Sequence, residues 1–208
     1  MLNPVFFGFI FMAVAIGASF WAARVQQARE RQRQESWAAM AEPLGLTYED
    51  GALAGEVEGV PVRLYVERNN IMGQSQHRIV LYVMQAEVPG QLPSGFVAAP
   101  RKWTSWSDRV TAPNVFKTGE PAVDEAYIFQ SYQTELGPKL LQDAEVLRAL
   151  ADLILPEASG FVQNNRVGLA YKTAPLTEDT DKVRHNVKLL VRAAQALAEA
   201  QARHRLAA

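Results

Sequence analysis

The sequence predicts an α+β fold: an N-terminal transmembrane helix, then a mostly antiparallel sheet covered on one face by helices. A long apolar run opens the chain, and short strand-like segments joined by tight turns follow it. Two amphipathic helical segments lie in the C-terminal third. The predicted organisation is an anchor over residues 1–23, a basic helical neck over 24–36 and one soluble α+β domain over 37–208.

The apolar run Val5–Ala23 contains no charged residue. As a helix it would span roughly 28 Å, close to the hydrocarbon thickness of a bilayer. A cleaved signal peptide is the alternative, but no Lys or Arg precedes the run, and the run is long for such a peptide. The residues expected at the membrane interface are Trp21, Arg24, Arg29, Arg31 and Arg33.

The charges around this run predict its orientation. Basic residues follow the run and none precedes it, so the positive-inside rule places the C-terminal side in the cytoplasm. The predicted location is the inner membrane of a bacterium, crossed once with the N-terminus outside, and the bilayer is the first expected partner. Ala13 and Gly17 are four residues apart, a spacing that lets two such helices pair closely as a homodimer.

In the first part of the soluble domain, the sequence predicts that the end of the neck helix packs on the domain and that strands follow it. Trp37, Met40, Ala41 and Leu44 have helical spacing, so this end of the neck is expected to pack on the domain. The next elements expected are strands over 46–49, 54–58, 61–68 and 78–88, with a hairpin at Gly59-Val60 and the last strand central in the sheet.

The later elements follow from turn residues and periodicity. Short strands are expected over 95–98 and 126–130, with a helical turn near 105–109, in a proline-punctuated region. An amphipathic helix is expected over Pro138–Leu155 and a hairpin around Asn164-Asn165. A last helix starts near Thr177; its cations either lie on an anionic membrane leaflet or form an ordinary solvated face.

The sequence lacks the residue patterns of the common catalytic and metal-binding sites. Cysteine is absent, the histidines at 77, 185 and 204 form no H-x-x-x-H pair, and no phosphate-binding loop or G-x-S-x-G motif is present. We therefore predict no catalytic residue, no metal site and no cofactor. Glu56 and Glu58 would share one strand face, where a charged edge strand is the better interpretation than acid–base catalysis. The net charge of −1 gives no reason to expect nucleic-acid binding.

The composition of one loop indicates a contact with a partner protein or a membrane surface. Arg101, Lys102, Trp103 and Trp106 combine two cations with two indole rings in a proline-rich segment. Tryptophan is enriched both at protein interfaces and at membrane surfaces. The alternative is that the two rings pin a long loop to the core.

Three segments resemble a known type of protein. They are WAAMAEPLGL at Trp37–Leu46, LAGEVEGVPVRL at Leu53–Leu64 and TGEPAVDEAYIF at Thr118–Phe129. Together with one anchor, they resemble uncharacterised bacterial membrane-anchored proteins of unknown function. The resemblance implies a single anchor and an α+β fold, and it implies no catalytic residue.

These observations predict a membrane-tethered, non-enzymatic interaction or scaffold domain that faces the cytoplasm. Its partner would be another membrane or cytoplasmic protein. The first alternative is a ligand-binding or sensory domain with a pocket between sheet and helices. The second is an enzyme of an unrecognised type.

Overall fold

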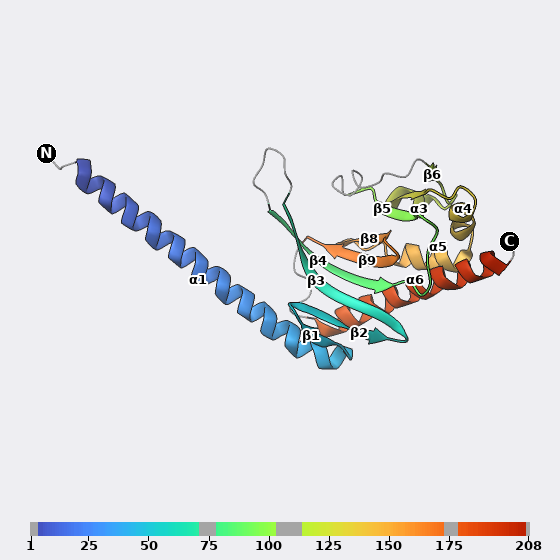
Figure 1. Ribbon diagram of the computed structural model, residues 1–208, viewed down its shortest axis with the longest axis horizontal. Helices are drawn as coiled ribbons and strands as arrows, with labels where there is room; N and C mark the ends of the chain where they lie inside the picture. Colours follow the sequence, from blue (N-terminus) through green and yellow to red (C-terminus); the bar gives the residue numbers. More distant parts are fainter. Residues whose placement is uncertain (1–3, 71–77, 103–113, 173–178, 207–208) are drawn as a thin grey trace.

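The computed structural model describes residues 4–70, 78–102, 114–172 and 179–206. Within these residues nine strands form one sheet in the order β1-β2-β3-β4-β9-β8-β5-β7-β6 (Figure 1). All paired neighbours run antiparallel. The predicted α+β class and antiparallel sheet are therefore confirmed.

The elements have the following bounds. The strands are β1 (Thr47–Glu49), β2 (Ala52–Val57), β3 (Val60–Asn70), β4 (Arg78–Glu87), β5 (Val97–Pro100), β6 (Asn114–Phe116), β7 (Tyr127–Ser131), β8 (Ala158–Gln163) and β9 (Arg166–Tyr171). The helices are α1 (Pro4–Leu44), α3 (Pro121–Ala126), α4 (Leu136–Leu141), α5 (Ala144–Asp152) and α6 (Thr180–Leu206). The expected helical turn at 105–109 lies outside the described residues.

Both predicted hairpins are present. The first turn is Glu58-Gly59, one residue earlier than the predicted Gly59-Val60, because Val60 already pairs with Val57 as the first residue of β3. Glu58 and Gly59 join β2 to β3 with φ of 53° and 78°, and Asn164 and Asn165 join β8 to β9 with φ of 53° and 61°. Consecutive positive φ values match the right-handed twist of the paired strands. The Asn165 side chain also donates to the Val88 carbonyl at 2.9 Å, so this turn is tied to the end of β4.

The helix predicted over Pro138–Leu155 is two helices, because Asp143 caps the second one. The Asp143 carboxylate accepts hydrogen bonds from the backbone N–H of Glu145 at 3.0 Å and of Val146 at 3.4 Å. Its other oxygen lies 2.6 Å from the Arg203 guanidinium of α6. An Asp side chain that accepts hydrogen bonds from the first free N–H groups of a helix marks the start of that helix. The apolar periodicity continues across this position, so it did not reveal that one helix ends and another begins here.

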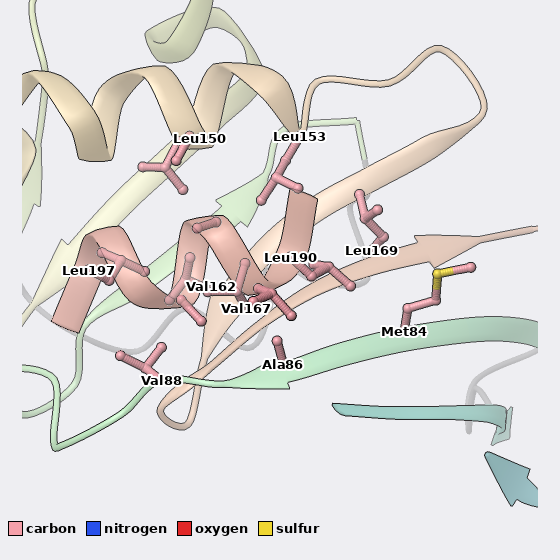
Figure 2. Packing of buried hydrophobic residues seen from close by; sticks show 14 of the residues in the cluster. Met84, Ala86, Val88, Leu150, Leu153, Val162, Val167, Leu169, Leu190 and Leu197 are labelled. Carbon is pink, nitrogen blue, oxygen red and sulfur yellow. The ribbon is translucent and has the colours of Figure 1, made fainter. Parts of the chain in front are cut away.

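The helices cover one face of the sheet, as predicted. α6 packs along β3, β4 and β9, and α4 and α5 pack against α6. Figure 2 shows Leu150 of α5, Leu153 just after α5 and Leu190 of α6 in the same buried cluster as Met84 of β4. All four are at most 1% exposed. The space between sheet and helices is thus filled by packed apolar side chains.

The predicted transmembrane helix is wrong. In the described parts of the chain, no helix is long and apolar enough to cross a membrane. α1 does not end at Ala23: it continues unbroken through the exposed Arg24 and Arg31 to Leu44. The prediction treated the apolar run as a separate segment, whereas the structure makes it one part of a helix with many charges. The predicted single-pass location in the inner membrane was inferred from that segment, so this prediction is also wrong.

Candidate functional site

The helix α1 projects far beyond the domain (Figure 1). Its 41 residues extend about 60 Å. Phe20 is 69% exposed and Trp21 is 71% exposed, and they lie on the projecting part. Arg24 and Arg31 are also exposed, so no described element covers these residues of α1. The side chains of Ala13, Arg29 and Arg33 lie outside the described part of the structure.

The C-terminal end of α1 docks on the domain, as its spacing predicts. Trp37 is 1% exposed and Met40 is 6% exposed, and Ala41 and Leu44 pack against the same core. Gly45, with φ of 68°, ends the helix, and the N–H of the following Leu46 donates to the Ala41 carbonyl at 2.9 Å. About two turns of α1 therefore hold the whole helix on the domain.

Part of the proposed contact loop is visible at the end of β5. Arg101 and Lys102 are exposed, while Trp103 and Trp106 lie outside the described residues. The backbone N–H of Arg101 donates to the Ala126 carbonyl at 2.9 Å, and its Nε donates to the Asp124 carbonyl at 2.9 Å. Arg101 thus fastens β5 to α3, and a contact between this loop and a partner or membrane stays a prediction.

Asp124 organises the segment Thr118–Phe129. Its carboxylate accepts from the Thr118 N–H at 2.8 Å, the Thr118 hydroxyl at 2.9 Å and the Gly119 N–H at 3.1 Å. Burial raises the pKa of Asp124, but the hydrogen bonds from Thr118 and Gly119 and the charge of Lys117 outweigh it and lower that pKa. Asp124 therefore holds the turn before α3 in place.

Replacing Asp124 by alanine should lower the free energy of unfolding by about 1–3 kcal/mol at neutral pH, because three donors lose a charged acceptor. The folded-state pKa lies below its ordinary value, so this stability is complete above about pH 4 and is lost as the pH falls through the folded-state pKa. Urea unfolding between pH 2.5 and 7 checks the prediction. Glu125→Ala, at an exposed neighbour, is the control, and an equal loss there would contradict it.

The cations of α6 are mostly paired with acids of the domain. The pairs are Lys182–Glu157 at 2.6 Å, Arg184–Asp181, Arg192–Asp152 at 3.6 Å and Arg203–Asp143 at 2.6 Å. Such pairing is typical of a packed terminal helix with a solvated face, the second of the two interpretations given above.

The second face of the sheet, here called the open face, carries its own features. Leu81, Val83, Phe161 and Ala170 form a small buried cluster there, with Tyr65 packed against it. Side chains alternate along a strand, so this cluster lies opposite Leu64 and Met84 of the main core. Two residues farther along β3 and β4, the same face becomes polar at Arg63 and Gln85, which are cross-strand partners.

A hollow of about 210 Å³ lies at this polar end of the open face. Its lining includes Arg63 from β3, Gln85 and Glu87 from β4, and Arg166 from β9. Glu87 and Arg166 form an ion pair at 3.1 Å. Sequence reasoning missed this group because its members lie far apart in the chain and the strand register alone brings them together.

The histidines of the sequence do not come together with acidic residues at a metal site in the described ranges. His185 is exposed on α6, and His77 lies outside the description. Within the described ranges, no three His, Asp or Glu residues are close enough to hold a metal ion. Glu56 lies in β2 and Glu58 in the following turn, so the expectation that they share one strand face is wrong.

The three segments that carry the resemblance have structural roles. Trp37–Leu46 is the docked end of α1, Leu53–Leu64 is the β2–β3 hairpin, and Thr118–Phe129 contains the Asp124 turn. The resemblance to membrane-anchored proteins of unknown function stays a prediction. Comparisons of the chain with protein-family models, with curated proteins and with solved structures find no match.

Proposed function

We propose that this protein is a non-enzymatic interaction module that binds a partner protein through the projecting part of α1. The observation that supports the proposal is the exposure of Phe20 and Trp21, at 69% and 71%, on a helix that docks only at its far end. Large exposed aromatic side chains are enriched where proteins bind one another.

The energetics of an isolated helix support the same proposal. Most helical stability in proteins comes from packing of an apolar face, and a helix without such packing is marginal in water. The projecting part of α1 exposes aromatic rings that association would remove from water. Burying each ring is worth roughly 1.5–3 kcal/mol. A partner that covers this part of α1 therefore gains affinity and stabilises the helix.

Site-specific photocrosslinking tests the proposal. A benzophenone amino acid replaces Trp21, and the matched control carries it in place of Tyr132, which is 53% exposed on the domain itself. We expect a discrete protein adduct from position 21 that position 132 does not give. Two differently tagged copies of the chain show whether that partner is a second copy, as pairing through Ala13 and Gly17 would require.

Two further results decide the interpretation. Phe20→Ser in the crosslinking variant should weaken the adduct at least severalfold, because it removes apolar area beside the probe. The same adducts from positions 21 and 132, or none from position 21, would contradict the proposal.

Ligand binding is the second candidate function, and the hollow on the open face favours it. An enzyme of an unrecognised type remains a prediction without a supporting site in the described residues.

A further inference from the structure

The hollow on the open face has the composition of an anion site. Arg63 and Arg166 contribute two positive charges and Glu87 contributes one negative charge, so one positive charge is in excess. Glu87 already pairs with Arg166. In the described part of the chain Arg63 has no carboxylate partner, and its guanidinium carbon lies 5.7 Å from the centroid of the Tyr65 ring. One guanidinium thus remains available to an added anion.

The strand register holds the polar groups in one place. Arg63 is the cross-strand partner of Gln85, and Glu87 is the cross-strand partner of Arg166. All four side chains point to the same face because Gln85 and Glu87 are two residues apart on β4. Residues on paired central strands are fixed by the ladder hydrogen bonds, so the site does not depend on a loop. The Gln85 amide, which has no hydrogen-bond partner in the described residues, adds N–H donors beside Arg63.

A small side chain leaves space beside Arg63. Its cross-strand partner on β2 is Ala54, which lines the hollow together with Gly55. The volume of about 210 Å³ is below the roughly 300–1,000 Å³ of pockets that enclose whole small molecules. The hollow therefore fits one charged group rather than a complete nucleotide.

We propose that this hollow binds a single small oxyanion, a carboxylate or phosphate group, between Arg63 and Arg166. The Arg63 guanidinium offers parallel N–H donors that match two oxygens of such a group, and the Gln85 amide donates to a third position. Arg166 contributes charge while it keeps its pair with Glu87. Because the site is partly open to water, we expect a Kd on the order of 1 mM. This site is independent of partner binding by α1.

Anion titration of the isotope-labelled full chain, followed by NMR, tests the proposal. The probes are sodium phosphate and sodium acetate, and sodium chloride is the reference at matched ionic strength. We expect a saturable shift of the Gln85 side-chain amide and Arg63 Nε–H signals with phosphate, acetate or both, and no such saturation with chloride. Saturation by phosphate alone identifies a phosphate site, and saturation by acetate alone identifies a carboxylate site.

Variants separate specific binding from a general charge effect. Arg63→Gln should raise the Kd at least tenfold. Arg63→Lys, which keeps the charge but loses the paired donors, should have an intermediate effect. The matched control is Arg148→Gln on α5, whose arginine is exposed and pairs with Glu145, and it should leave the Kd unchanged. Equal titrations of Arg63→Gln and the unaltered chain, or equal shifts with chloride and both oxyanions, would overturn the proposal.

Discussion

Replacing Trp37 by alanine is expected to lower the free energy of unfolding by about 3–5 kcal/mol, which is the usual cost of truncating a buried Trp or Phe. Trp37 is 1% exposed and is the largest buried side chain at the end of α1. Its removal leaves a cavity between α1 and the core, and it releases the contact by which α1 docks. Urea unfolding followed by circular dichroism measures the loss.

The same helix provides the control for this prediction. Trp21→Ala removes an identical side chain that is 71% exposed, and we expect a change within about 0.5 kcal/mol. Trp37→Phe adds a second test. Among the described residues, the buried Nε1 of Trp37 has no hydrogen-bond partner. Phenylalanine therefore loses volume without losing one of the described hydrogen bonds and should cost clearly less than alanine. Equal losses for Trp21→Ala and Trp37→Ala would show that α1 does not dock through Trp37.

Gly160→Ala is expected to destabilise the protein by about 2–3 kcal/mol through overpacking. A Cβ at this position of β8 would lie 2.3 Å from the Tyr127 hydroxyl oxygen and 2.9 Å from the Leu153 carbonyl oxygen. The carbonyl belongs to the backbone and cannot rotate away. Thermal and urea unfolding measure the effect, and Gly17→Ala, which meets no described atom within 4 Å, should cause no loss.

A double-mutant cycle with Tyr127→Phe isolates the contact. Tyr127→Phe alone removes the hydrogen bond from the Tyr127 hydroxyl to the Leu150 carbonyl, 3.3 Å long and worth about 1 kcal/mol. In the Gly160→Ala background it also removes the closest clashing atom. The double variant should therefore be more stable than the sum of the single losses predicts, by about 0.5–3 kcal/mol. Strict additivity would contradict the proposed contact.

Several strands were predictable because their signals are local. The alternation of Val62, Leu64 and Val66 with polar residues specified β3, and the apolar length of β4 placed it centrally, the fourth of nine strands in the sheet. Asn164 and Asn165 identified the β8–β9 turn because they tolerate positive φ. Other elements lacked such signals: β6 is three residues long, and α3 is a single short helix beside it.

The sequence by itself determined the α+β class, the hairpins and the docked end of α1, because helical or strand periodicity and turn chemistry act over a few neighbouring residues. Only the tertiary structure decided the rest. Asp143 competes with helix continuation through its cap, and the apolar run continues into the charged part of α1 rather than forming a separate span. The hollow exists because three strands pair in one register, which places Arg63, Gln85 and Arg166 together although about 100 residues separate the first from the last.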